Sequence, residues 1–185
     1  MDVMTAILTR RSIHELAGPA PSDQEFAYLL KGAAAAPDHG GLRPWRWILL
    51  RDAELAAVGD RLGADAEDRG DSAGGAPAGE ESVRAPLKAV LVFSPSAESG
   101  VPEWEQLAAA SNVAYGLMLL LHARGFGSVW RKGRWCRSER SRELLGIGPD
   151  EQLLGSLDIG TPGARVRPDR RRVEDVTDRM CVLRT

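Results

Sequence analysis

The sequence predicts an α+β fold, and two observations support this prediction. Segments with the apolar spacing of helices alternate along the chain with short runs of strand-forming residues. Neither a GxGxxG fingerprint nor a regular strand–helix–strand repeat accompanies them, which argues against a doubly wound parallel sheet. A length of 185 residues suits one domain, which we expect to span residues 1–185.

Two helices are predicted near the N-terminus. The first covers residues 2–9 and is followed directly by a double arginine. Ser22 is predicted to cap the second helix, residues 23–35, because Glu25 three residues later completes a capping box. Pro37 is expected to end this helix, since the residue before a proline disfavours helical geometry.

Four strands are predicted from short runs rich in leucine, β-branched and aromatic residues. The clearest run, residues 87–93, lies between Pro86 and Pro95 and contains no polar residue except Lys88. The predicted strands cover residues 45–50, 87–93, 128–131 and 152–159.

The longest predicted helix covers residues 104–124. It is apolar nearly all round, so we expect it to lie in the centre of the fold, and its small residues, Gly116 included, would allow another backbone to approach closely. Shorter helices are predicted at residues 53–62 and 138–145. Residues 63–82 are dominated by Gly, Ala, Asp and Glu, and we interpret them as a loop or a frayed helix.

Composition argues against several classes of function. The formal net charge of −2 favours neither nucleic acid nor an anionic membrane, and the arginine-rich residues 165–172 are followed by acidic residues that neutralise them. No apolar run is long enough to span a bilayer. The histidines and cysteines lack metal-ligand spacing, so no metal site is expected, and reduced thiols in a cytoplasmic protein are the expected state of both cysteines.

Three short blocks concentrate residues suited to a planar, phosphorylated molecule. In the first, Arg10, Arg11 and Ser12 could hold a phosphate, because guanidinium groups form charge-assisted hydrogen bonds with phosphate oxygens. The negative end of the preceding helix dipole would explain the same arginines without any ligand. Both interpretations remain open from position alone.

The second and third blocks combine glycines with aromatic and basic residues. Residues 36–45 contain a glycine pair and His39, and glycines let the main chain approach a ligand, although a plain connecting loop is the alternative. In the third block, Trp130, Arg131 and Lys132 leave the end of a predicted strand and suit a planar, anionic partner.

In this order, the blocks resemble the FMN-dependent nitroreductase family, specifically its small single-domain bacterial NAD(P)H nitroreductases. The resemblance implies a three-layer α+β fold, in which a central, mostly antiparallel sheet is flanked by helices and two chains interlock into a homodimer with FMN at the interface. The motifs that support it are Arg10-Arg11-Ser12, Ala36-Pro37 to Pro44-Trp45, Arg84-Ala85-Pro86, Trp104-Glu105-Gln106, Gly125-Phe126-Gly127 to Trp130-Arg131 and Gly160-Thr161-Pro162.

The resemblance also implies roles for residues of one chain. Arg10, Arg11 and Ser12 would hold the phosphate and ribityl end of FMN, and Pro37 and His39 would line the isoalloxazine ring from the same chain.

Other contacts are implied from the partner chain. Trp130, Arg131 and Lys132 would approach the flavin from that chain, and the helix that begins at Trp104 would form much of the dimer contact.

Three positions depart from the pattern of the family. Gly41 and Arg43 stand where the family commonly has carboxamide residues that touch the ring, so the ring contacts are expected to come from His39 and main chain. Ala35 is also expected to contact the cofactor, and close relatives often carry a basic residue there, which predicts a weaker hold on the phosphate.

The function implied by the resemblance is FMN-dependent NAD(P)H oxidoreduction. Hydride would pass by a ping-pong route from NAD(P)H through FMN to a nitroaromatic, a quinone or a similar small electron-poor acceptor. No side chain is expected to act as a catalytic acid or base, because the cofactor performs the chemistry. The alternative is a module that binds or sequesters flavin with little turnover.

Overall fold

The computed structural model describes residues 1–51, 53–58, 85–164 and 171–183, and every structural statement below concerns these residues. They form a five-stranded sheet whose pairings are all antiparallel. The strand order is β1-β5-β3-β2, and β4 also pairs with β5. The strands are β1 (Leu16–Ala17), β2 (Trp45–Leu50), β3 (Leu87–Phe93), β4 (Gly127–Arg131) and β5 (Gln152–Pro162).

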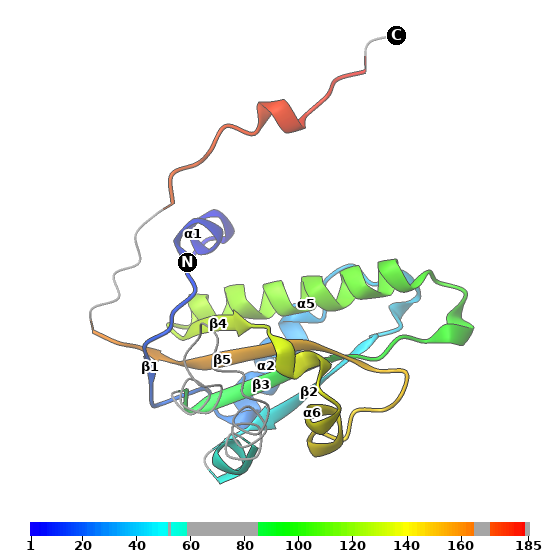
Figure 1. Cartoon of the computed structure of the whole chain (residues 1–185). Helices are drawn as coiled ribbons and strands as arrows, with labels where there is room; N and C mark the ends of the chain where they lie inside the picture. The colour runs from blue at the N-terminus through cyan, green and yellow to red at the C-terminus, as the bar shows by residue number, and fades with distance from the viewer. Residues whose placement is uncertain (52, 59–84, 165–170, 184–185) are drawn as a thin grey trace.

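Helices cover both faces of this sheet (Figure 1). On one face lie α2 (Asp23–Ala33) and α5 (Glu103–Ala123). On the other lie residues 53–58, the short helix η3 (Arg134–Arg137) and α6 (Glu139–Leu144). The α+β fold with a central antiparallel sheet flanked by helices is therefore confirmed.

Two apolar clusters form the core, one on each face of the sheet. Along β3, Leu87 and Ala89 belong to the cluster under α2 and α5, whereas Val90 and Val92 belong to the opposite cluster. This alternation follows from the two-residue period of a strand. It also directs the side chain of Lys88 toward the face away from α5.

The N-terminal helices begin where the sequence predicts. The helix α1 spans Val3–Thr9, and the hydroxyl of Ser22 caps α2 by accepting a hydrogen bond from the amide of Glu25 at 3.2 Å. The backbones of α2 and α5 approach closely at Gly116, where an added Cβ would stand in van der Waals contact with Cα of Ala33 at 3.6 Å. The predicted close backbone approach at Gly116 is confirmed.

The position of α5 differs from the prediction. Rather than lying in the centre, this helix covers one face of the sheet, and its outer side is open in the single chain. Trp104 is 69% exposed, and Leu107 and Tyr115 are exposed as well. Exposed apolar side chains gathered on one side of a helix are typical of interaction surfaces.

The strands differ from the predicted ones in two places. The two-residue β1 was not predicted, and β5 extends to Pro162, three residues beyond the predicted end. Residues 53–58 are helical as predicted, whereas the rest of that predicted helix and residues 63–82 lie outside the described part. Within the described ranges, no helix is long and apolar enough to cross a membrane.

Candidate functional site

The double arginine lies where α1 ends. Arg10 is the C-cap of the helix, and Nη1 of Arg11 donates to the carbonyls of Leu8 at 3.0 Å and Arg10 at 3.3 Å. Ser12 then forms a parallel bridge with Ser128 of β4. These contacts hold the block Arg10-Arg11-Ser12, which we call the arginine block, against the strand that leads to Trp130.

Arg10 holds a buried donor without an acceptor. Its Nη1 has no hydrogen-bond partner among the described residues. Burial lowers the pKa of this guanidinium, and the nearby cations Arg171 and Arg11 lower it further. An unpaired buried donor costs free energy, and concentrated positive charge adds repulsion. Both costs would be relieved by an anion, so the residues fit a phosphate group.

Arg171 reaches this block from the C-terminal segment, in which the sequence predicted only a basic cluster neutralised by acidic residues. Its main-chain amide donates to the carbonyl of Leu8 at 2.9 Å, beside the guanidinium of Arg11. Figure 1 shows the C-terminal segment running past α1. The basic composition of the segment was visible in the sequence, but its return to the end of α1 was not.

His122, in the last turn of α5, completes the surroundings of Arg10. Its Nε2 lies 2.7 Å from Oγ1 of Thr9, the last residue of α1. Burial lowers the pKa of His122, and the charge of Arg10 lowers it further, which favours the neutral imidazole. His122 lacks metal-ligand spacing and the sequence predicted no other role for it, so this contact was not expected.

The loop after α2 is shaped by glycines and by Asp38. Gly40 and Gly41 have φ angles of 78° and 62°, in the left-handed region that glycine adopts without strain. Arg43 shares that region at 49°, although it carries a side chain. The Asp38 carboxylate stabilises the turn by accepting hydrogen bonds from the amides of Leu42 at 3.2 Å and Arg43 at 2.7 Å. The backbone conformation of this turn therefore explains the glycine pair even without a ligand.

His39 projects from this loop toward the start of α5. Its Nδ1 lies 2.8 Å from Oε2 of Glu105, and its side chain is 68% exposed. Ala35 and Pro37 are exposed nearby. We call these three residues the loop block.

The loop block and the arginine block lie at opposite ends of α5 (Figure 1). Glu105 contacts His39, and His122 contacts Thr9 beside Arg10. At about 1.5 Å of rise per residue, α5 separates Glu105 from His122 by about 25 Å. This separation is longer than one FMN molecule.

Trp130 is fixed at the end of β4 by β5. Its indole Nε1 donates to the carbonyl of Leu154 at 3.1 Å, and Nζ of Lys132 lies 4.4 Å from the ring centroid. At Gly155, with φ of 124°, an added Cβ would stand only 2.7 Å from Nε1 of Trp130. It would stand closer still to the carbonyl oxygen of Arg131, so a side chain at this position would displace the end of β4 as well as the indole. The residues Trp130-Arg131-Lys132 form what we call the tryptophan block.

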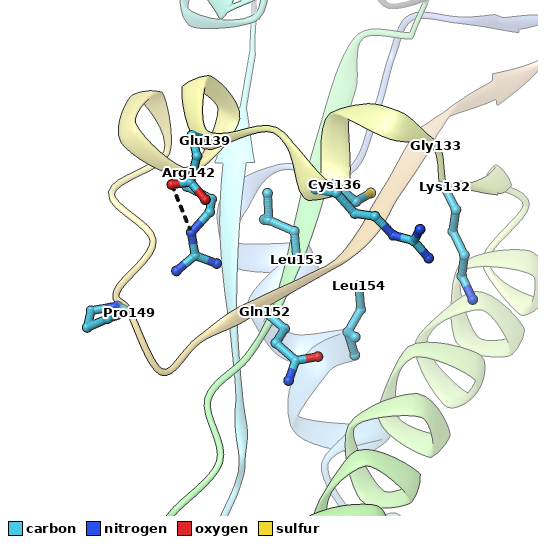
Figure 2. A pocket seen from close by; sticks show the side chains of 10 residues that line it. Lys132, Gly133, Cys136, Glu139, Arg142, Pro149, Gln152, Leu153 and Leu154 are labelled. Atoms are coloured by element: carbon cyan, nitrogen blue, oxygen red, sulfur yellow. Dashed lines mark ion pairs between the residues drawn. The ribbon is translucent and has the colours of Figure 1, made fainter.

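A cavity of about 920 Å³ opens beside the tryptophan block. Lys132 stands at one end, with Cys136 of η3, Arg142 of α6, and Gln152 and Leu153 of β5 around it (Figure 2). Burial raises the pKa of the Cys136 thiol, so this cysteine is not an activated nucleophile. The cavity offers cationic and apolar walls without a nucleophile or a metal cluster among the described residues.

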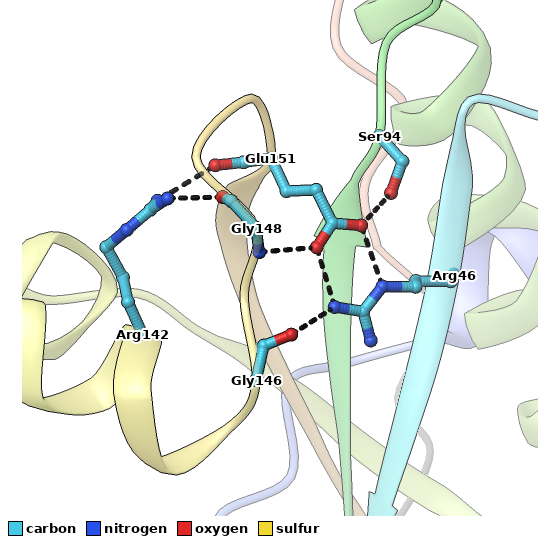
Figure 3. Close-up of polar contacts among 6 residues, drawn as sticks. All are labelled: Arg46, Ser94, Arg142, Gly146, Gly148 and Glu151. Atoms are coloured by element: carbon cyan, nitrogen blue, oxygen red, sulfur yellow. Dashed lines mark hydrogen bonds and ion pairs between the residues drawn. The ribbon is translucent and has the colours of Figure 1, made fainter.

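A polar network fixes the turn that precedes β5 (Figure 3). The Glu151 carboxylate accepts hydrogen bonds from Nε and Nη2 of Arg46 at 2.8 and 2.7 Å. It also accepts from the hydroxyl of Ser94 at 2.6 Å and the amide of Gly148 at 2.9 Å. The hydrogen bond from Arg46 is the largest cause that lowers the pKa of Glu151 to about 2. Arg142 donates to the carbonyl of Glu151 at 2.8 Å, which ties α6 and the cavity wall to the same turn.

The structure therefore brings together only part of the predicted site. The arginine block and the strand of the tryptophan block meet through Ser12 and Ser128. The loop block lies at the other end of α5 in the same chain, where His39 contacts Glu105.

Comparison with known proteins agrees with this architecture. A model of the Nitroreductase family matches residues 7–161. The chain is 31% identical over 168 residues to the putative NAD(P)H nitroreductase YdjA of Escherichia coli (strain K12), which covers 88% of this chain and 89% of the relative. It is also 31% identical over 171 residues to a putative NAD(P)H nitroreductase of Haemophilus influenzae, with 87% and 89% covered.

Solved structures share the fold at lower sequence identity. A nitroreductase-like family protein from Bacillus cereus superposes with a TM-score of 0.83 at 20% identity, over 100% of this chain and 97% of the other. A mutant of NfnB, an FMN and NADPH-dependent nitroreductase derived from Sphigopyxis sp. strain HMH, gives a TM-score of 0.77 at 20% identity over 99% of both chains. With the family match and the curated relatives, the conclusion is direct: the chain belongs to the nitroreductase family.

Proposed function

We propose that this chain is an FMN-dependent NAD(P)H oxidoreductase. It would transfer hydride by a ping-pong route to a nitroaromatic, a quinone or a similar small electron-poor acceptor, as a cytoplasmic homodimer. The observation that supports it best is Nη1 of Arg10, a buried donor with no acceptor among the described residues, beside the cations Arg11 and Arg171. The family membership and the FMN and NADPH-dependent neighbour agree with it.

The chemistry of the arginine block fits the phosphate end of FMN. Arg10 and Arg11 offer guanidinium donors, and Ser12 offers a hydroxyl. When bound, FMN supplies the hydride chemistry, and the protein supplies binding, orientation and charge.

The tryptophan block is the part of the same chain best placed to meet the ring. Ser12 and β4 are joined through Ser128, so the two blocks are neighbours. Trp130 offers an aromatic surface, and Arg131 and Lys132 offer cations that would stabilise a reduced, anionic flavin.

We revise the expected assignment of chains for the remaining contacts. The separation of about 25 Å along α5 keeps the loop block of one chain away from the arginine block of that chain. A site built from the arginine and tryptophan blocks of one subunit and from Ala35, Pro37 and His39 of the other accommodates all the candidate residues.

Exposed apolar side chains support a homodimer. They lie on α1, on the outer side of α5 and along the C-terminal segment, and a single chain leaves them in contact with water. They are Val3, Met4, Ile7, Trp104, Leu107, Tyr115, Val173, Val176, Met180, Val182 and Leu183.

The visible spectrum of the purified protein tests the proposal. A yellow protein, or an apoprotein that binds added FMN, is expected to lose its flavin absorbance on anaerobic addition of NAD(P)H and to regain it with a quinone. Arg10→Met is expected to weaken FMN binding at least about tenfold, the loss of one charge-assisted interaction. The matched control is Arg124→Met, an exposed arginine that forms an ion pair with Glu25.

Two results would contradict the proposal in different ways. A protein that binds no FMN overturns it altogether. A protein that binds FMN but fails to oxidise NAD(P)H steadily with an added acceptor is instead a flavin-sequestering module.

A further inference from the structure

A buried charged cluster lies on the sheet face away from α5, beside the apolar side chains of Val90 and Val92. Lys88 of β3 and Asp158 of β5 stand directly opposite each other in the strand register. They are only 7% and 3% exposed. Nζ of Lys88 forms an ion pair with Oδ1 of Asp158 and lies 3.4 Å from the hydroxyl of Ser156.

The same carboxylate reaches the tryptophan block. Oδ2 of Asp158 accepts a hydrogen bond from Nε of Arg131 at 2.8 Å. Arg131 lies on β4, which pairs with β5 on the side opposite β3. One carboxylate therefore joins two cations from two strands, and each oxygen serves a different cation.

Stability alone does not explain this cluster. Moving charges out of water is costly, and apolar residues of similar volume commonly replace a buried ion pair without loss of stability. The neighbouring positions on this face, such as Val90 and Val92, are apolar, so the face could have been apolar throughout. The charged pair is more readily explained by what it does to Arg131.

We infer that Asp158 is a positioning residue for Arg131, and that Lys88 compensates the buried carboxylate. A hydrogen bond at Nε fixes the plane of a guanidinium group, because Nε is the atom that joins the planar group to its flexible stem. Arg131 is thus held in one orientation at the end of β4. This inference rests on the proposed function, in which Arg131 contacts the flavin.

A four-member cycle tests the inference without leaving Lys88 or Asp158 as an unpaired charge in the core. Its members are the wild type, Arg131→Gln, Lys88→Met/Asp158→Leu, and the variant with all three substitutions. Asp158→Leu alone would strand Lys88 in the core, so the ion pair is replaced as a unit. Lys88→Met by itself is a control, because it keeps the hydrogen bond between Asp158 and Arg131. Thermal unfolding of each variant establishes that it is folded, and Lys88→Leu/Asp158→Val, which also removes the acceptor of Arg131, is the second choice.

Two readouts separate positioning from a merely structural role. The first is the equilibrium dissociation constant for FMN, measured by flavin fluorescence. Replacing the pair is expected to weaken FMN binding about tenfold when Arg131 is present, the loss of a charge-assisted contact, and less than about twofold when residue 131 is glutamine. Lys88→Met is expected to bind FMN within about twofold of the wild type, because Arg131 keeps its acceptor.

The second readout is independent of FMN. In the apoprotein, the NMR signal of the Arg131 Nε–H group, assigned by its absence from Arg131→Gln, is expected to be protected from exchange in Lys88→Met and to lose that protection in Lys88→Met/Asp158→Leu. The inference is overturned if the signal stays protected in Lys88→Met/Asp158→Leu. It is also overturned if replacing the pair weakens FMN binding equally with and without Arg131. Absence of FMN binding in the wild type overturns the proposed function, and the arginine signal then decides the positioning step by itself.

Discussion

Oγ1 of Thr9 lies 2.7 Å from Nε2 of His122, and this contact fixes the end of α1 to the last turn of α5. Arg10 follows directly, so its guanidinium and the imidazole of His122 share one partly buried environment. The arginine block is thus tied to a helix as well as to β4.

The pH dependence of stability is expected to report His122. Burial and Arg10 lower its pKa in the folded state, so the unfolded state binds the proton more strongly. Stability is therefore highest above the ordinary histidine value of 6.5 and declines as the pH falls below it. We expect His122→Gln to reduce the fall in melting temperature between pH 7 and pH 5.5 relative to the wild type. Parallel curves for the two proteins would contradict this assignment.

Arg10→Met is expected to stabilise the apoprotein. The substitution removes a buried guanidinium nitrogen that has no acceptor in the described part of the chain, and a gain of about 1 kcal/mol in the free energy of unfolding is expected. Urea unfolding without FMN measures it, and Arg124→Met, which removes an exposed cation, is expected to change stability by less than about 0.5 kcal/mol. A destabilised Arg10→Met apoprotein would show that Arg10 has a structural role instead.

Acid unfolding is expected to depend on Glu151. Its pKa is lowered from 4.5 to about 2, so its contribution to stability is complete above pH 4.5 and is lost as the pH falls toward 2. Glu151→Gln is expected to cost about 2 kcal/mol at pH 7, a typical value for a charge-assisted hydrogen bond.

The difference between Glu151→Gln and the wild type should shrink as the pH is lowered toward 2. Glu143→Gln on the exposed side of α6 is the matched control, with no expected effect. A constant difference across this range would contradict the assignment of the low pKa to Glu151.

Gly155→Ala is expected to displace Trp130. At a φ of 124°, a Cβ would stand 2.7 Å from the indole nitrogen and closer still to the carbonyl oxygen of Arg131. The end of β4 would have to move, so the hydrogen bond from Trp130 to Leu154 would break and stability would fall by about 2 kcal/mol. The change in tryptophan fluorescence and the unfolding curve measure the two effects. Gly148→Ala, where the added Cβ meets Glu151 at 3.5 Å, is the control glycine and should leave the fluorescence unchanged.

Local rules predicted the elements well. The hydroxyl of Ser22 and the apolar run of β3 determine a helix start and a strand without help from distant residues. The two-residue β1 escaped prediction because Leu16 and Ala17 pair with Thr161 and Pro162, far along the chain. Strand pairing at that distance leaves no pattern in a two-residue segment.

The candidate site was harder to predict because it depends on distant contacts. The sequence indicates cations at Arg10 and Arg11 but not the approach of Arg171 or the neutral His122. A helix that is apolar all round, such as α5, indicates burial without saying what buries it. The pairing of Asp158 with Arg131 likewise follows from strand order, which composition does not reveal.

The length of α5 has a genetic consequence. If each complete site takes its arginine block from one subunit and its loop block from the other, two defective chains can repair each other. A heterodimer of Arg10→Met and His39→Ala chains would contain one site with both defects and one with neither. Two inactive alleles would then complement when expressed together. If each site were confined to a single subunit, both subunits of the heterodimer would stay inactive.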